Sequence, residues 1–319
     1  MSVAQGRGEL ILFNRIRIIS WLLAFCLWLS SGAYAASMLI VLSDDSAAYQ
    51  ETATAIEQEL GSSHKATRVL ADRLASGAID LSDVRLVLGI GVKATETASA
   101  RTGKIPLLAV LVPRDWYQKT GRSLLAEGGR NAGAIVLDQP YQRQLRLIKE
   151  TLPRARKVGV IISQGNAPQL AEIEQAARAY GLSLGSSVIN SDDMLVEAME
   201  KVLSDADLLL AVPDPIVINR NTVQSLFITS YRYRDPVIGF SKSLSRAGAL
   251  AALFSTPSQI GQQAGEIAER AVSGARLSSM YWPKYFSITL NTHVARSLDL
   301  DIPTEFSLLQ ALQEGGASD

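Results

Sequence analysis

The sequence predicts an α/β protein made of two Rossmann-like lobes, each with a parallel sheet covered by helices. Apolar strands alternate with amphipathic helices along most of the 319 residues, a pattern typical of parallel sheets with helices on both faces. The pattern starts over near residue 157, so the chain consists of two halves of similar order. Without an N-terminal leader of 35 residues, the remaining 284 residues exceed one typical domain and fit two lobes.

The first 35 residues have the pattern of a secretory signal peptide. Arg7, Arg15 and Arg17 precede an apolar run at 18–29, and the segment ends in an Ala-x-Ala sequence at Ala35. The apolar run is shorter than the roughly 20 residues that span a bilayer. We therefore expect cleavage after Ala35 and export of the chain to the periplasm. An uncleaved membrane anchor is the alternative.

Charge and residue types exclude several classes of function. Without residues 1–35 the chain keeps 28 basic and 30 acidic residues, which is not the electrostatic footprint of a nucleic-acid-binding protein. Cys26 lies in the leader, and His64 and His293 are the two histidines. Thiol nucleophiles and clustered metal ligands are therefore missing. We expect a soluble exported protein with no metal, no cofactor and no catalytic centre.

The first half begins with a strand at 38–42 and a polar turn at 43–46. A helix follows in which Tyr49, Ala53, Ile56 and Leu60 lie on one face at helical spacing. The later expected elements are strands at 66–70, 84–90, 107–112 and 134–137 and a helix at 94–101.

The second half repeats this order. A strand at 158–162 and a polar turn at 163–166 precede a helix at 168–180, which Gly181 ends. The later expected elements are strands at 183–189, 208–212 and 237–240 and helices at 193–203 and 222–233. An Ala/Gly-rich passage then leads into a further helix before residue 265.

Three segments that contain proline are the expected crossings between the lobes: 137–141, 254–258 and 281–285. Proline fixes φ and cannot extend a central strand, so we expect a three-strand hinge about which the lobes close. Ordinary surface turns are the alternative. The lobes would then comprise 36–138 with 257–281, and 139–256 with 282–319. The cleft between two such lobes is a favoured place for a small-molecule site.

A glycine-rich segment at 89–94 loosely matches the G-x-G-x-x-A fingerprint of dinucleotide-binding proteins. It follows an internal strand, however, and Arg114 rather than an acidic residue stands after the next strand. We therefore favour a tight turn at which a ligand or the other lobe approaches backbone amides.

Five segments of the sequence carry a resemblance to a known family: AIVLDQP at 134–140, KVGVII at 157–162, Pro213-Asp214-Pro215, AGALA at 247–251 and QIGQQA at 259–264. With them the chain resembles the ABC-transporter substrate-binding proteins of the type I periplasmic-binding-protein fold, in the branch grouped with tryptophan- and tyrosine-binding proteins. Where amino-acid-binding relatives often have Asp followed by Asn, this chain has Pro215 after Asp214, which leaves the ligand open.

The resemblance implies that loops after strands of both lobes hold the ligand. The positions that correspond are Ser43, Asp44, Ala94, Thr95 and Arg114 in the first lobe, and Gln164, Asn166, Asp214, Ser241 and Thr256 in the second lobe.

The chemistry of these residue types suits a small zwitterion. Such a ligand needs a carboxylate for its cationic end, which Asp214 would supply, and hydroxyls or helix N-terminal amides for its anionic end. Ser43, Thr95 and Ser241 fit the second role. The alternatives are that Asp214 forms a turn and that the hydroxyls cap helices.

The resemblance also implies the partners. We expect a monomer that captures a small solute, closes on it and presents it to an ABC permease in the inner membrane. It would not be an enzyme and would not bind nucleic acid. A periplasmic ligand sensor for a signalling partner is the alternative.

Overall fold

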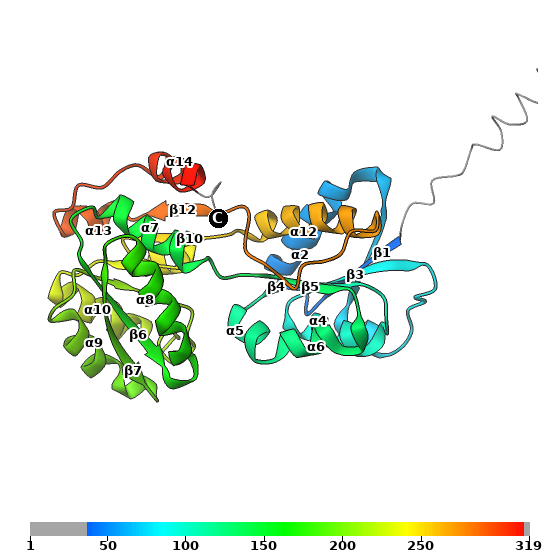
Figure 1. The fold of residues 1–319 in the computed structure, drawn as a ribbon, viewed down its shortest axis with the longest axis horizontal. Coiled ribbons are helices and arrows are strands. Elements are labelled where there is room, and N and C mark those ends of the chain that lie inside the picture. The colour runs from blue at the N-terminus through cyan, green and yellow to red at the C-terminus, as the bar shows by residue number, and fades with distance from the viewer. Residues whose placement is uncertain (1–36, 316–319) are drawn as a thin grey trace, which may run out of the picture. The chain divides into compact units, whose positions relative to one another are not determined.

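A computed structural model describes residues 37–315, and the predicted signal peptide with its cleavage site lies outside these residues. The described chain forms two six-stranded, mostly parallel sheets with helices packed around them (Figure 1). This confirms the predicted α/β class with two Rossmann-like halves. Among residues 37–315, no helix combines the length and the apolar character needed to cross a membrane.

The first sheet is parallel throughout, as predicted. Its strands are β1 (Ser37–Leu42), β2 (Lys65–Leu70), β3 (Val84–Ile90), β4 (Leu107–Val112), β5 (Ala132–Val136) and β11 (Met280–Tyr281), in the spatial order β11-β5-β4-β3-β1-β2. Its α-helices are α2 (Ala47–Leu60), α3 (Ala71–Ala75), α4 (Val92–Arg101), α5 (Arg114–Trp116), α6 (Arg122–Ala126) and α12 (Pro257–Val272). Every residue of β4 is buried, which explains why this strand is a continuous apolar run.

The second sheet contains one strand that breaks the expected parallel pattern. Its strands are β6 (Lys157–Ser163), β7 (Ser183–Ile189), β8 (Leu208–Leu210), β9 (Val237–Gly239), β10 (Ala251–Phe254) and β12 (Ser287–Leu290), in the order β12-β10-β9-β8-β6-β7. The edge strand β12 runs antiparallel to β10. Its α-helices are α7 (Tyr141–Thr151), α8 (Leu170–Ala179), α9 (Leu195–Leu203), α10 (Val223–Tyr233), α11 (Lys242–Ala247), α13 (Thr292–Ser297) and α14 (Glu305–Gly315).

The Ala/Gly-rich passage holds two elements that the sequence pattern does not reveal, α11 and β10. Alanine has a low preference for strands, so local composition gives no sign of β10. The segment forms a strand because β10 pairs with β9 on one side and with β12 on the other, in the buried interior of the sheet.

The chain passes between the two sheets three times, and hydrogen bonds connect the passages. Gln139 Nε2 donates to Ser255 Oγ at 2.8 Å, and Ser255 Oγ donates to the carbonyl oxygen of Tyr285 at 2.5 Å. Arg143 joins the first passage to the third through the carbonyl oxygen of Pro283 at 2.9 Å. Two of the passages lead directly into helices, since α7 follows the first and α12 starts at Pro257.

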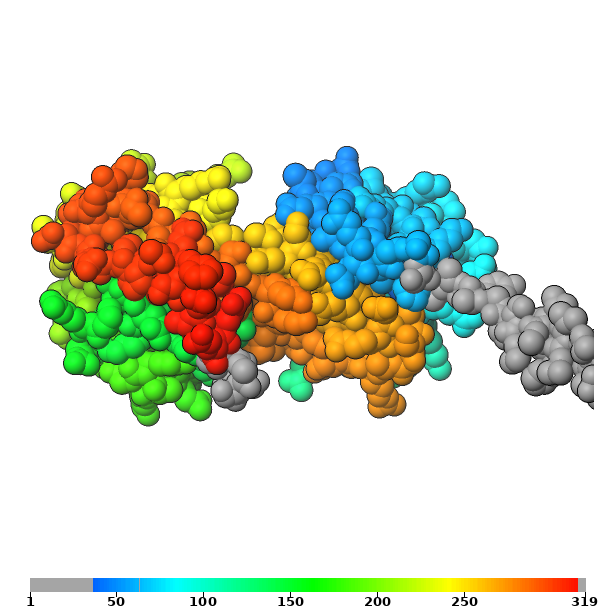
Figure 2. All heavy atoms as spheres, turned by 90° about the horizontal axis from the view of Figure 1, so that it is seen from above, coloured from blue at the N-terminus to red at the C-terminus, as the bar shows by residue number. Residues whose placement is uncertain are grey.

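Helix α12 packs along α2, so that residues some two hundred positions apart in the sequence lie side by side (Figure 2). Two glycines of α12 permit this close approach. A Cβ atom at Gly261 would lie 2.5 Å from the carbonyl oxygen of Thr52, and one at Gly265 would lie 2.5 Å from Glu59 Cβ.

We expect Gly261→Ala to lower the free energy of unfolding by about 1–2 kcal/mol. Overpacking typically costs about 1–3 kcal/mol, and the higher helix propensity of alanine offsets part of this cost. Urea denaturation measures the change. The control is Gln262→Ala on the exposed side of the same helix, where we expect no loss. Equal stabilities of the two variants would contradict tight packing of α12 on α2.

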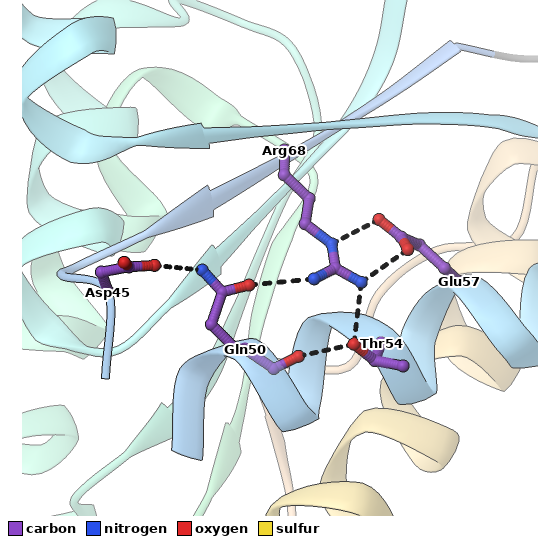
Figure 3. Close-up of polar contacts among 5 residues, drawn as sticks. All are labelled: Asp45, Gln50, Thr54, Glu57 and Arg68. Atoms are coloured by element: carbon purple, nitrogen blue, oxygen red, sulfur yellow. Dashed lines mark hydrogen bonds and ion pairs between the residues drawn. The ribbon is translucent and has the colours of Figure 1, made fainter. Parts of the chain in front are cut away.

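A polar network holds α2 against β2 and reaches the turn after β1 (Figure 3). The Arg68 guanidinium donates to both carboxylate oxygens of Glu57, at 2.5 and 2.6 Å, and to Gln50 Oε1 at 2.9 Å. Gln50 Nε2 in turn donates to Asp45 Oδ1. The network therefore fixes the start of α2 relative to the polar turn.

Candidate functional site

A cavity of about 320 Å³ lies where the carboxyl ends of strands from both sheets meet. The loops after β4, β5, β8, β9 and β10 contribute to its wall, together with α7. Its lining residues are Pro113, Leu137, Asp138, Gln139, Gln144, Pro213, Phe240, Ser241, Phe254 and Ser255. Ligands of open α/β sheets bind at such strand ends, so this cavity is the candidate binding site.

Gln144 lines the cavity and carries a hydrogen-bond acceptor to which no described residue donates. Its side chain is buried, and its Nε2 donates to the carbonyl oxygen of Gln139 at 2.9 Å. That bond fixes the orientation of the amide. Gln144 Oε1 is buried without a hydrogen-bond partner among the described residues. A buried carbonyl oxygen without a donor is costly, so a ligand that brings an N–H or O–H group here gains affinity.

The other polar groups of the wall come from Asp138 and Ser241. Burial raises the pKa of Asp138, and the hydrogen bond from the Arg114 backbone amide, at 2.7 Å to Oδ2, opposes this rise. Ser241 Oγ accepts from the Leu244 amide at 3.2 Å as the N-cap of α11. Capping uses the hydroxyl only as an acceptor, so Ser241 keeps a hydrogen to donate into the cavity.

Arg114 lies beside the cavity and connects the two halves of the chain. Its buried guanidinium stacks over the rings of Tyr141, at 5.4 Å, and Trp282, at 5.0 Å, a favourable arrangement for a cation. It also forms an ion pair with Glu172 of α8. The charge of Arg114 is therefore held by protein groups.

The carboxylate of Asp214 organises loops of the second half. Oδ2 accepts from the amide of Ser163 at 2.8 Å and from Asn166 Nδ2 at 3.0 Å, while Oδ1 accepts from the amides of Ile216 and Val217 at 3.0 and 3.3 Å. Burial acts to raise the pKa of Asp214, but these hydrogen bonds lower it below its ordinary value. These contacts are those of a turn-forming residue.

Three predicted residues of the first lobe form hydrogen bonds around the turn between β3 and α4. Ser43 Oγ donates to the carbonyl oxygen of Ile90 and accepts from the Ala94 amide, both at 2.9 Å. Thr95 Oγ1 donates to the carbonyl oxygen of Gly91 at 2.8 Å. The hydroxyls therefore stabilise the turn between β3 and α4.

Four further predicted residues do not line the cavity. Asp44 Oδ1 accepts from the Ser46 amide at 2.9 Å, and Thr256 forms a capping box with Gln259 at the start of α12. Asn166 Oδ1 accepts from Lys119 Nζ at 3.3 Å, and Gln164 is exposed. Ser241 is the predicted ligand residue that lines the cavity. The ligand-binding role of all ten residues stays a prediction.

Sequence reasoning did not select Asp138, Gln144, Phe240 and Phe254. Asp138 and Phe254 lie in the predicted crossings 137–141 and 254–258. The expected cleft between the lobes therefore already placed these two residues near a ligand. No expected element contains Gln144, because the sequence pattern predicts no helix where α7 lies.

Two α/β lobes with a cavity at the strand ends of both define a solute-binding protein of the two-lobed kind. The family model of the ABC transporter substrate binding protein matches residues 51–313. The chain therefore belongs to the ABC transporter substrate-binding protein family, whose members bind solutes and are not enzymes.

The chain is also similar to individual proteins. A tyrosine-binding protein of Clostridioides difficile (strain R20291) is 22% identical over 214 residues, which cover 65% of this chain and 59% of that relative. The chain thus matches about three-fifths of the length of this curated relative.

Two solved structures share the fold. One is the ligand-free, open structure of a substrate binding protein with adhesive properties from Clostridium difficile, with 18% identity, a TM-score of 0.67, and coverage of 85% of this chain and 97% of that chain. The other is an ABC domain from Streptococcus pneumonia in complex with L-Trp, with 16% identity, a TM-score of 0.55, and coverage of 87% and 98%.

Proposed function

We propose that the protein captures a small polar ligand, an amino acid or a related compound, in the cavity at the strand ends and delivers it to an ABC permease. In this proposal the chain is exported through a cleaved signal peptide and acts in the periplasm. Its lobes are 36–138 with 257–281, and 139–256 with 282–319, and the three passages between them form the hinge.

The observation that carries the proposal is the composition of the cavity wall. Phe240 and Phe254 provide an apolar surface, while Gln144 Oε1 and the carboxyl group of Asp138 are acceptors for an ammonium group. The Ser241 hydroxyl can donate to a carboxylate. A zwitterion with an apolar or aromatic side chain satisfies all three features, and the tyrosine and tryptophan in the relatives' names support this class.

Binding would also favour one arrangement of the lobes. Because the cavity wall comes from loops of both sheets, a ligand that contacts both walls binds best when the walls are close together. By mass action it then shifts the population toward that arrangement. A permease that recognises this arrangement receives loaded protein in preference to empty protein.

We expect L-tyrosine, L-tryptophan or another amino acid of a broad panel to raise the melting temperature of the protein. A ligand at a hundred times its Kd adds about 2.7 kcal/mol of stability, which corresponds to roughly 5 °C for a chain of this size. Differential scanning fluorimetry measures the shift. The matched control is the N-acetylated derivative of each hit, which lacks the ammonium group and for which we expect no shift. If every amino acid leaves the melting temperature unchanged, the proposed function is wrong.

A further inference from the structure

A second cavity lies at the other end of strand β9. The candidate ligand cavity touches Phe240 and Ser241, which follow the strand, whereas the second cavity touches Asp235 and Pro236, which precede it. Helices α10 and α13 provide the other walls. The second cavity measures about 620 Å³, within the range of about 300–1,000 Å³ typical of small-molecule sites. The proposed function makes no use of it.

Asp235 contributes a buried carboxylate to this cavity. The residue is 9% exposed, and its backbone is anchored to Ser230, since its amide donates to the Ser230 carbonyl oxygen at 3.1 Å and its carbonyl oxygen accepts from the Ser230 hydroxyl. Its side-chain Oδ2 is buried with no hydrogen-bond partner among residues 37–315. A buried carboxylate without a donor is strongly unfavourable. Burial, and then repulsion by Asp207, raises the pKa of Asp235 to about 7.

The charged groups around Asp235 are directed to other partners. Arg232 lines the cavity but forms an ion pair with Glu200 at 2.7 Å. His293 lines it from α13, with Nδ1 lying 3.0 Å from an Arg296 guanidinium nitrogen. The Asp207 carboxylate accepts hydrogen bonds from the backbone amides of Arg156 and Lys157. Among the described residues, the Asp235 carboxylate therefore has no cation paired with it.

The rest of the cavity is largely apolar. Phe227, Val294 and Leu298 form part of its wall, and Ile228 and Tyr231 of α10 line it with side chains that are 54% and 63% exposed. Large exposed apolar side chains beside a cavity favour a ligand with an apolar body. Together with one buried carboxylate, the wall matches an amphipathic cation.

We propose that this second cavity binds a small amine with an aromatic or apolar body, with the ammonium group donating to the Asp235 carboxylate. The site is separate from the proposed amino-acid site and does not depend on it. Its ligand needs no carboxylate, because Arg232 of the wall is already paired with Glu200.

The test uses 2-phenylethylamine as the probe and 2-phenylethanol as its matched neutral analogue. Isothermal titration calorimetry at pH 7.5 is expected to show saturable binding of the amine, with the alcohol binding at least tenfold more weakly. Asp235→Asn keeps the shape of the side chain and removes its charge, and we expect it to weaken amine binding at least tenfold without changing alcohol binding. The Gln144→Met variant of the other cavity should bind the amine like the parent protein.

Melting temperatures at two pH values serve as a second measurement. They check that Asp235→Asn folds, and they test the burial of the Asp235 carboxylate. Because the folded-state pKa of Asp235 is above its ordinary value of 3.8, the parent protein loses stability as the pH rises from about 4 through 7. The variant lacks the Asp235 contribution to this loss. Its melting temperature should exceed that of the parent at pH 8 and equal it at pH 4. Undiminished amine binding by Asp235→Asn, or loss of binding only in Gln144→Met, would overturn the proposal.

Discussion

Replacing Asp214 with alanine is expected to lower the free energy of unfolding at pH 7 by about 3–5 kcal/mol. The carboxylate accepts four hydrogen bonds inside the second half of the chain, and alanine leaves all four donors without this acceptor. Each buried donor left unpaired costs about 1–3 kcal/mol, and water entering at the loop recovers part of the sum. Chemical denaturation of the purified protein measures the loss. Asp83→Ala, at an exposed turn position, is the control and should change stability by less than about 0.5 kcal/mol.

The effect of Asp214→Ala should depend on pH. Since the folded-state pKa of Asp214 is lowered below 3.8, its carboxylate contributes stability above the ordinary pKa and loses that contribution as the pH falls through the lowered value. The difference between parent and variant should therefore shrink below about pH 3.8. A variant as stable as the parent that no longer binds the ligand would favour the direct ligand role predicted from the sequence.

Much of the fold follows from the sequence because the inner strands of a parallel sheet are apolar along their whole length. Strands β3 and β4 have the predicted bounds, since apolar runs of six or seven residues between polar turns have few other arrangements. The short strands β10, β11 and β12 carry less local information. Their existence depends on which neighbour they pair with, which is a property of the assembled sheet rather than of any window of the chain.

The candidate site was harder to predict than the fold, for a related reason. The sequence places Ser43, Thr95 and Asp214 after strands, where ligand residues stand, but capping and turn-forming residues stand there too. Which role a side chain takes depends on where donors from other segments converge. For Asp214 the donors come from residues 163–166 as well as from its own turn. Such contacts join positions about fifty residues apart and leave no periodic trace in the sequence.

Gln144→Met is expected to reduce the affinity for the amino-acid ligand by roughly 10- to 100-fold while leaving the empty protein nearly as stable as the parent. A hydrogen bond from a charged group contributes about 1.5–3 kcal/mol, and each 1.4 kcal/mol is about tenfold in Kd. Methionine has a similar length and cannot accept the ligand's ammonium group in the same way. In the empty protein, the lost bond to the Gln139 carbonyl oxygen is offset by removal of the unpartnered Oε1.

The same substitution at Gln164 provides the matched control. Gln164 follows β6 and is a ligand residue by sequence, yet it is exposed and does not line the cavity. Calorimetric titration with the ligand found in the melting panel should show parent-like affinity for Gln164→Met and the full loss for Gln144→Met. If instead Gln164→Met lost affinity and Gln144→Met kept it, the binding site would lie at the polar turn 163–166, as the sequence predicts. Equal affinities of both variants and the parent would remove Gln144 from the site, because an acceptor that contacts the ligand cannot be deleted without cost.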